Sequence, residues 1–405
     1  MNETAVYICT DPGVPAFGAK GCSVHVQEVL RRLTVRFREV HLITTRPGGT
    51  PPPELAGVVV HALTRPAGPD LATREQAQCA ADAAAAEVLA TLFRRVGPGP
   101  VELVYQRYAL WSAATLETAR ALGVPSVLEI NAPLLTEQAA HRGLVDAARA
   151  TRRTARLLAA ADAPFAVSGP VARWAERLDP RRRTVPVVPN GVDVERFTPA
   201  GVAPAGSTGA LTVAFSGTFK PWHGLDLLVG ATAAARERGA RLRLLLIGDG
   251  PEHTATVAAA ARHGIPVTAT GQVDPARVPA LLHGADLAVA PYPAPALGPA
   301  GGPSAGPHYF SPLKVAEYLA AGLPTVASAI ADLPDLVADG VEALLVAPGD
   351  LDGTADALVR LATEPALRRR LAAGGRRAAE DRFSWASVVD TTLALLPAHH
   401  RAEIA

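Results

Sequence analysis

The chain has 405 residues, and at this length we expect roughly two or three domains, each able to bury a core of its own. Its formal net charge is +1, so no global electrostatic attraction would draw it to nucleic acid. Its three cysteines, Cys9, Cys22 and Cys79, are odd in number and show no metal-ligand spacing, which favours a reducing compartment. No apolar run reaches the roughly eighteen residues of a membrane span. We therefore expect a cytoplasmic protein, and a peripheral contact with a membrane surface stays an open alternative.

Short apolar segments alternate with helical segments through the first half of the chain, which is typical of a parallel sheet. Residues 5–9 predict the first strand, and a loop rich in glycine and proline follows at residues 11–21. The next helix has an apolar stripe made of Val26, Val29, Leu30 and Leu33. Further strands are expected at residues 40–44, 58–61, 103–105, 126–130, 163–167 and 185–188.

A linker is predicted at residues 199–209, where Pro, Gly, Ala, Ser and Thr replace apolar bulk. A second series of strands follows at residues 211–215, 242–247, 267–270, 287–290 and 325–327. The fold class is therefore α/β, with two doubly wound, Rossmann-like parallel-sheet domains, whose ligands are expected beyond the carboxyl ends of the strands. We place the domains at residues 1–205 and 206–380, with a final helix within residues 381–405.

One helix start, within residues 309–328, combines an anion-binding geometry with a carboxylate. Ser311 is a good N-cap and Pro312 fits the first helical position, so the next free amides point outward. Lys314 adds a positive charge, and Glu317 lies on the same face, where a carboxylate can accept two hydrogen bonds from a ribose diol. The segment suits a nucleotide diphosphate, and an ordinary capped helix with a surface Lys and Glu pair is the alternative.

Two loops, each between a strand and a helix, are also suited to an anion. Residues 18–21 contain two glycines and a lysine, and residues 217–224 carry Lys220 and His223 beside a glycine turn. A plain turn in the first loop and a packing role for Trp222 in the second are the alternatives. Three such segments, each after a strand, together favour an anionic ligand.

The motifs follow one another from Gly18 to Glu317 in an order that resembles a retaining glycosyltransferase of family 4, which has the GT-B fold. The family's Gly-Arg-x-x-x-x-Lys-Gly opening of the second domain is matched at residues 217–224, with Thr218 at the Arg position and His223 at the Lys position. The form Lys-Pro-Trp-His-Gly, with the Ser-Pro-Leu-Lys helix start, resembles a subgroup in which Lys220 would replace the missing cation. The resemblance also implies an acceptor site in the first domain, a cleft facing the second, and a final helix that crosses back to the first.

The resemblance implies a role for each matched residue. The second of the family's signature glutamates falls on Glu317, which would hold the ribose, and the first falls on Tyr309. Val273 would contact the nucleobase. The residues that face the donor sugar would be Asn131, His308, Tyr309 and Phe310. The donor diphosphate would be bound by Gly18, Lys20, Gly21, Gly217, Thr218, Lys220, Ser311, Pro312, Leu313 and Lys314.

Three of these residues, Lys220, Lys314 and Asn131, would be catalytic. Asn131 falls where many relatives carry a histidine, and it could hydrogen-bond a sugar hydroxyl. The alternative is an Asn that caps the following helix or turns the chain before Pro133. The matching segment at residues 247–252 is interpreted as a structural turn.

The implied function is transfer of a sugar from a nucleotide diphosphate, with a UDP-sugar as the first expectation, to an unidentified small-molecule or glycan acceptor. Anomeric configuration would be retained. Amides and lysines would hold the diphosphate, so we expect no metal ion and no cofactor, because the nucleotide-sugar is a substrate. A nucleotide-sugar 2-epimerase of the same architecture and a weakly active sugar-nucleotide-binding relative are the alternatives. Both a monomer and a homodimer are compatible with the sequence.

Overall fold

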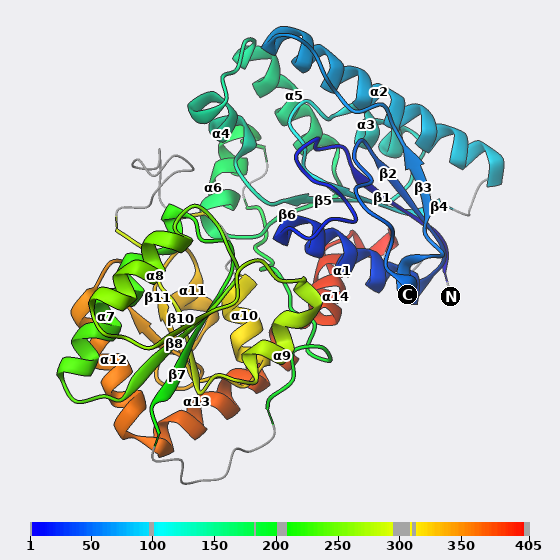
Figure 1. The fold of residues 1–405 in the computed structure, drawn as a ribbon. Coiled ribbons are helices and arrows are strands. Elements are labelled where there is room, and N and C mark those ends of the chain that lie inside the picture. Colours follow the sequence, from blue (N-terminus) through cyan, green and yellow to red (C-terminus); the bar gives the residue numbers. More distant parts are fainter. Residues whose placement is uncertain are drawn as a thin grey trace. The chain divides into compact units, whose positions relative to one another are not determined.

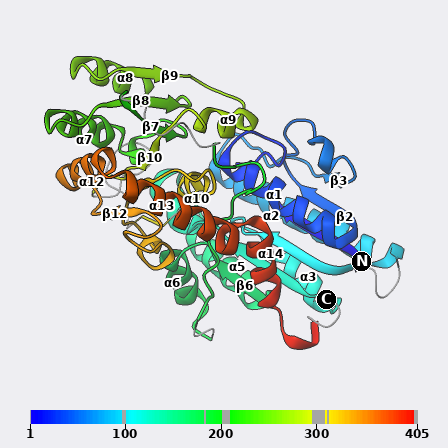
Figure 2. The same cartoon turned by 90° about the horizontal axis from the view of Figure 1, so that it is seen from below.

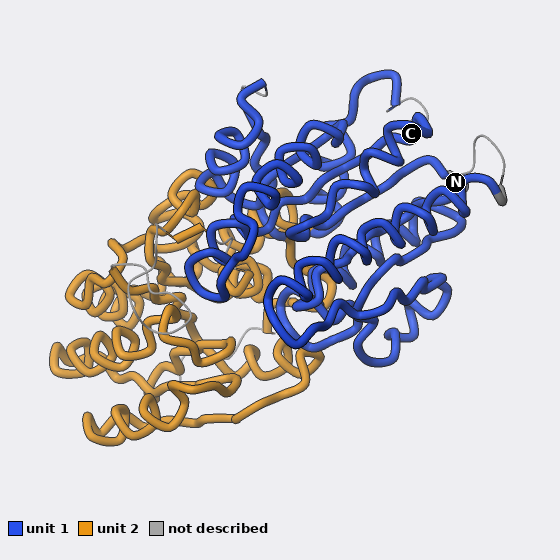
Figure 3. The backbone as a smooth tube through the Cα atoms, turned by 90° about the horizontal axis from the view of Figure 1, so that it is seen from above, with its two compact units in different colours: residues 1–190, 385–405 blue, residues 191–384 orange. Residues whose placement is uncertain are grey.

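The computed structural model describes residues 2–96, 101–181, 184–200, 209–294, 308–309 and 313–400. The chain divides into two compact units, residues 1–190 with 385–405 and residues 191–384, drawn in blue and orange in Figure 3. The first unit ends earlier than the boundary placed at residue 205, and the last helix groups with it. Within the described ranges, no helix is both long and apolar enough to cross a bilayer.

Unit 1 alternates strands and helices along the chain. Its strands are β1 (Asn2–Cys9), β2 (Phe37–Thr44), β3 (Val59–Ala62), β4 (Val101–Arg107), β5 (Ser126–Ile130) and β6 (Ala163–Ala166). Its helices are α1 (Gly21–Arg36), α2 (Leu71–Val96), α3 (Ala114–Ala121), α4 (Leu134–His141), α5 (Ala147–Ala160), α6 (Gly169–Leu178) and α14 (Trp385–Ala394).

The strands of unit 1 form one parallel six-stranded sheet in the order β3-β2-β1-β4-β5-β6. Successive strands run outward from β1 to one edge and from β4 to the other, so the topological switch point lies between β1 and β4. Helices α1 and α14 lie on one face of this sheet, and α2, α3 and α5 cover the other (Figures 1 and 2). The predicted stripe of α1 is fully buried.

Unit 2 repeats this architecture. Its strands are β7 (Leu211–Ser216), β8 (Leu242–Ile247), β9 (Val267–Ala269), β10 (Leu287–Ala290), β11 (Thr325–Ser328) and β12 (Leu344–Val346). Its helices are α7 (Leu225–Glu237), α8 (His253–Arg262), α9 (Val278–Leu282), α10 (Leu313–Ala320), α11 (Leu333–Leu336), α12 (Leu351–Thr363) and α13 (Pro365–Ala378).

The second sheet is parallel, with the order β12-β11-β10-β7-β8-β9, so its switch point lies between β7 and β10. Side chains of β7 alternate between its two faces: Val213 and Phe215 join the core formed with α7 and α12, and Ala214 joins the core formed with α10. Because both faces of the sheet are covered, its central strands β7 and β10 are almost fully buried and mainly apolar, and this explains why they were readily predicted.

One predicted strand is absent, and one observed strand was not predicted. Residues 185–188 make no strand, because Val187 forms a single bridge to Ala166 and Pro186 has no N–H to donate to a longer ladder. β12 was missed, since it is a short edge strand that carries little periodic signal. The other predicted strands are present, with their ends shifted by at most a few residues. Most of the predicted linker, residues 201–208, lies outside the described residues.

Candidate functional site

The carboxyl edge of the second sheet brings together two of the predicted anion-binding segments. Residues 217–224 follow β7, and α10 follows β10, so both lie at the switch point, where doubly wound sheets bind their ligands. A methyl group built on Gly217 would lie 3.4 Å from Lys314 Nζ. Gly217 has a φ of 147°, a backbone conformation that favours glycine. The structure therefore places the glycine turn and the lysine ammonium next to each other.

Lys314 is a buried cation without a fixed partner. The residue is 8% exposed, and Nζ has no hydrogen-bond partner among the described residues. Nζ lies 4.3 Å from the ring centroid of Phe215 and 5.6 Å from that of Tyr292, and such ring faces stabilise a cation weakly. Burial lowers the pKa of Lys314 to about 7, although the charge of Glu317 opposes this shift. A buried ammonium without a counter-ion is costly, which points to an anionic ligand.

His223, at the position of the family's lysine, does not supply the missing charge. Its Nδ1 is hydrogen-bonded to the carbonyl oxygen of Thr218, so this nitrogen carries the proton and donates. Burial and the charge of Lys314 lower the pKa of His223 to about 2, and the imidazole is therefore neutral. Lys220, half-buried on the same loop, is the cation that this segment contributes.

The turn after β8, residues 248–250, holds the backbone of this loop. Gly217 N donates to the Ile247 carbonyl and Phe219 N to the Asp249 carbonyl, each at 3.0 Å. A methyl group on Gly248 would lie 2.0 Å from the Gly217 carbonyl oxygen, so the two chains approach too closely for any side chain there. The turn that was interpreted as structural supports the loop that would contact the ligand.

The predicted ribose and nucleobase residues lie at the same edge of unit 2. Glu317 is half-buried one turn after Lys314, and burial raises its pKa to about 7 against the charges of Lys314 and Arg196. Val273 lies in the segment after β9, the edge strand that pairs with β8. In the order of the sheet, the loop after β7 therefore lies between Glu317, on the helix after β10, and the backbone after β9.

The residues predicted to face the donor sugar are described in part. His308 is buried, and its Nε2 lies 3.0 Å from the Pro293 carbonyl oxygen, to which it donates. Tyr309 is half-buried, and Leu313 is the first residue of α10. Phe310, Ser311 and Pro312 lie outside the described residues, so the predicted N-cap stays a prediction.

The distribution of lysine marks the same segments. The chain has 39 lysines and arginines together, and just three of them are lysines: Lys20, Lys220 and Lys314. Each lysine belongs to one of the three segments predicted to bind an anion. Elsewhere the chain uses arginine, so the lysines lie where a compact ammonium is suited to a point contact with phosphate oxygens.

The anion loop of unit 1 lies at the switch point between β1 and β4. Gly18 N donates to the Pro15 carbonyl at 3.1 Å, and Gln27 Nε2 donates to the Gly18 carbonyl at 2.9 Å. Lys20 and Gly21 are exposed at the start of α1, and no side chain of the described residues caps this start. The Ser23 amide donates to the Lys20 carbonyl at 2.8 Å, and binding of an anion at this helix start stays a prediction.

A buried carboxylate, Glu129, organises the carboxyl ends of β4 and β5. Its side chain is fully buried; it accepts a hydrogen bond from Tyr105 Oη at 2.8 Å and lies 2.5 Å from His25 Nε2. Arg107 Nη1 lies 3.3 Å from Glu129 Oε1. Although burial acts to raise it, the pKa of Glu129 is lowered to about 2 by His25, Arg107 and Asn131. Glu129 is thus an ionised hydrogen-bond acceptor.

Asn131 belongs to this network. Its Nδ2 donates to Glu129 Oε1. Helix α4 begins at Leu134, and Pro133 occupies its N-cap position. The alternative that Asn131 caps the following helix was therefore wrong, because its amide group is held by Glu129.

Sequence reasoning missed the contribution of Glu129. The signal was available, since this residue stands inside the apolar strand segment Ser-Val-Leu-Glu-Ile, and a carboxylate in a strand covered on both faces must be paired. Its partners could not be found from the sequence, because they come from α1 and β4. His25, which showed no partner in the sequence, is one of them.

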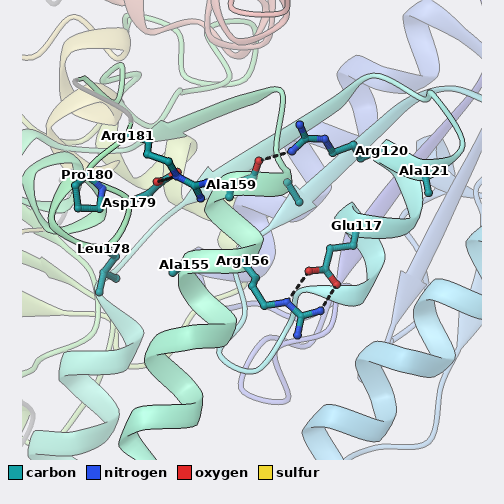
Figure 4. Close-up of a pocket in the computed structure, with 11 residues that line it drawn as sticks. Glu117, Arg120, Ala121, Ala155, Arg156, Ala159, Leu178, Asp179, Pro180 and Arg181 are labelled. Atoms are coloured by element: carbon teal, nitrogen blue, oxygen red, sulfur yellow. Dashed lines mark hydrogen bonds and ion pairs between the residues drawn. The ribbon is translucent and has the colours of Figure 1, made fainter.

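Two cavities among the described residues of unit 1 lie at opposite edges of its sheet. The larger, about 550 Å³, lies among the C-terminal ends of α3, α5 and α6 (Figure 4). There Arg156 donates two hydrogen bonds of 2.7 Å to Glu117, and Arg120 donates to the Ala159 carbonyl at 2.9 Å. These contacts link helices at the amino ends of the strands, away from the edge where such sheets bind ligands.

The smaller cavity, about 80 Å³, lies at the carboxyl edge of the sheet. Residues after β1, after β4 and on α4 line it together with one residue of α2: Asp11, Pro12, Gly13, Gln78, Leu110, Leu134, Glu137, Gln138 and Arg142. Its place at the switch point and its polar lining make it the candidate binding site of unit 1.

Two family models match the chain, one in each half. The model described as Glycosyltransferase Family 4 matches residues 19–196, and the model described as Glycosyl transferases group 1 matches residues 210–364. Each half of the chain therefore matches a glycosyltransferase family model.

Curated relatives agree with these models. The D-inositol 3-phosphate glycosyltransferase of Actinosynnema mirum is 36% identical over 220 residues, which are 51% of this chain and 50% of that protein. The one from Stackebrandtia nassauensis is 29% identical over 400 residues, 93% of this chain and 86% of that protein. The MMP alpha-(1->4)-mannosyltransferase of Mycolicibacterium hassiacum is 34% identical over 213 residues, 52% and 47% of the two chains. The chain thus spans about half the length of several relatives that it matches.

Solved structures share the fold. HepE from Anabaena, in complex with UDP and glucose, has a TM-score of 0.66 at 16% identity and covers 97% of this chain and 100% of its own. Sucrose-phosphate synthase from Thermosynechococcus elongatus has a TM-score of 0.66 at 21% identity and covers 97% and 98%. The two units therefore have the GT-B fold that was predicted, with two parallel six-stranded sheets flanked by helices.

Proposed function

We propose that the protein is a retaining, metal-independent glycosyltransferase that uses a UDP-sugar as donor. The observation that carries this proposal is the buried Lys314 ammonium, which has no hydrogen-bond partner in the described chain and lies beside Gly217. A diphosphate placed over the loop after β7 would give this ammonium its counter-ion. The proposal assigns the leaving diphosphate to Lys220 and Lys314, the ribose to Glu317 and the nucleobase to Val273.

These groups have a direct chemical task. Negative charge grows on the diphosphate as the glycosidic bond breaks, and preorganised positive charge at that place is often the largest catalytic contribution. Because two ammonium groups and the amides of the glycine turn supply this charge, the proposal needs no metal ion. The proposed reaction uses no enzyme nucleophile. The acceptor hydroxyl attacks the anomeric carbon on the leaving-group face as the bond from that carbon to the diphosphate oxygen breaks, and the hydroxyl proton passes to the leaving diphosphate.

The comparisons support the donor class. HepE is a GT-B neighbour whose structures are in complex with UDP, with UDP and glucose, and with UDP-glucose. Several curated relatives are named as glycosyltransferases or mannosyltransferases. We assign the acceptor to the carboxyl edge of unit 1, where the cavity lined by Asp11 and Glu137 lies.

A panel of nucleotides tests the proposal. We expect UDP to bind more tightly than ADP or GDP in calorimetry, and one UDP-hexose to be hydrolysed slowly without acceptor. Lys314→Met should weaken UDP binding at least tenfold, with Arg277→Met, a surface cation of unit 2, as the matched control. Release of an epimerised nucleotide-sugar with the sugar still attached would instead support a 2-epimerase. Unchanged UDP affinity in Lys314→Met would refute the diphosphate assignment.

A further inference from the structure

The side chain of Asn131 has one group engaged and one open. Its Nδ2 donates to Glu129 Oε1, and its Oδ1 is buried and without a hydrogen-bond partner among the described residues. A buried acceptor that lacks a partner destabilises the free protein. The open oxygen therefore points to a donor group supplied by a ligand.

The surroundings of Glu129 determine which end of the Asn131 amide faces it. Tyr105 Oη at 2.8 Å and Arg107 Nη1 at 3.3 Å donate hydrogen bonds to the carboxylate, and His25 Nε2 lies 2.5 Å from it. A carboxylate among such donors stays ionised and can only accept, so Asn131 must turn its NH₂ group toward it. Rotating the amide by half a turn would set two acceptors against each other.

We propose that Glu129 is a positioning residue that fixes the Asn131 amide with Oδ1 directed to the substrate, where it accepts a hydrogen bond from one sugar hydroxyl. This inference rests on the proposed function, because it takes the ligand of this edge to be a sugar. Asn131 then selects a group that donates a hydrogen bond, and it disfavours a fluorine, a ketone or a phosphate at that position of the sugar ring.

Four other elements keep Glu129 in place. Its partner His25 lies on α1 and packs edge-on against Trp385 of α14, with 4.7 Å between ring centroids. Tyr105 on β4 stacks on Tyr7 of β1 at 5.4 Å. Since α1, β1, β4 and α14 all bear on the carboxylate, the Asn131 amide is held more rigidly than a side chain on a free loop would be.

The orientation of the amide can be measured without a substrate. The chain has three asparagines, Asn2, Asn131 and Asn190, so selective ¹⁵N-asparagine labelling gives three side-chain NH₂ signals, and Asn131→Ala assigns one of them. We expect the Asn131 NH₂ protons to be shifted downfield and slow to exchange. Glu129→Gln should remove both properties. Glu28→Gln, which alters another buried carboxylate of unit 1 that pairs with Arg31, should leave them unchanged.

The second measurement identifies the hydroxyl. The best UDP-hexose of the wild-type protein is compared with its monodeoxy and deoxyfluoro analogues. At one position we expect both analogues to lose about fivefold to tenfold in kcat/KM, because neither can donate a hydrogen bond. Asn131→Ala should lower kcat/KM for the parent donor by the same factor and show no further loss with those analogues. UDP affinity should stay within twofold of wild type in Asn131→Ala and in Glu129→Gln.

Several outcomes would overturn the inference. One is a fluoro analogue that keeps full activity, since Asn131 would then be donating. Another is an Asn131 NH₂ signal that is unaffected by Glu129→Gln, which would leave Glu129 with a structural role. If Glu129→Gln does not fold, the wild-type and Asn131→Ala spectra and kinetics decide the matter. A wild-type protein that binds no UDP would refute the proposed donor site, and the NH₂ spectrum alone would then confirm or refute the positioning role.

Discussion

Lys314 should take up a proton when the donor binds. In the free protein, burial lowers the pKa of Lys314 from 10.5 to about 7. At pH 8 about one-tenth of the Lys314 amine is then protonated, because each pH unit above the pKa lowers the ratio of ammonium to amine tenfold. A bound diphosphate places negative charge beside Nζ and restores the charged form. The expected uptake is about 0.9 proton per site at pH 8, falling to about 0.1 at pH 6.

Calorimetry with a UDP-sugar measures this uptake. Binding enthalpies collected in buffers of different ionisation enthalpy give the number of protons taken up as their slope. A UDP-sugar has no phosphate group that titrates between pH 6 and 8, so its own ionisation adds nothing. Selective ¹³C labelling of the three lysines follows Lys314 directly, since each lysine reports on one predicted anion segment.

Two variants separate Lys314 from other sources of protons. Lys314→Arg carries a group that stays charged, so we expect the uptake at pH 8 to disappear. Lys220→Arg is the matched control and should keep it. Glu317 also titrates near neutrality, because burial raises its pKa to about 7, and Glu317→Gln removes this contribution. An uptake near zero at pH 8 in the wild-type protein, or one that Lys314→Arg leaves intact, would refute the reasoning.

Four further predictions concern the same residues. Between about pH 7 and 10.5 the unfolded chain binds more protons at Lys314 than the folded protein, so stability without ligand should rise with pH across this window; thermal unfolding of Lys314→Met should lack the rise. Glu317→Ala should lose the preference for UDP over 2′-deoxy-UDP or 3′-deoxy-UDP in calorimetry, whereas an unchanged preference would place the ribose elsewhere. Gly217→Ala should cost on the order of 1–3 kcal/mol of stability in a denaturant titration, because its φ of 147° is strained for alanine, and should also weaken UDP binding. With Asp11 and Glu137 in the lining of the unit 1 cavity, neutral polyols should be better acceptors than their phosphates, and the reverse order in a transfer assay would contradict this assignment.

Most of the fold could be predicted from the sequence, because the buried central strands are mainly apolar and alternate with helices that have an apolar stripe. The failures have local causes. Residues 185–188 are apolar but include Pro186, which cannot extend a ladder beyond the bridge of Val187. The end of unit 1 was misplaced because the compositional break at residues 199–209 comes after the chain has already left that unit at Asn190.

The candidate site was predicted less completely, because its chemistry depends on contacts between distant segments. The glycine turn and Lys314 were recognised separately, but their separation is set by the packing of β7 against β10. No pattern indicated that His223 would donate a hydrogen bond to the Thr218 carbonyl and stay neutral. The four partners of Glu129 come from three different elements, and sequence spacing does not show which of them meet.

The choice of lysine at position 314 has a physical reason in a chain that otherwise uses arginine. Arginine cannot lose its charge in a protein, so a buried guanidinium without a partner would destabilise the free enzyme throughout the physiological range. Lysine avoids this cost by releasing a proton, which its lowered pKa allows near neutrality. The ammonium re-forms when the diphosphate arrives and is then held, largely desolvated, against the group whose charge must grow during the reaction. Lys20 is exposed and gains no such advantage from burial, so Lys20→Arg should be tolerated where Lys314→Arg lowers the stability of the free protein.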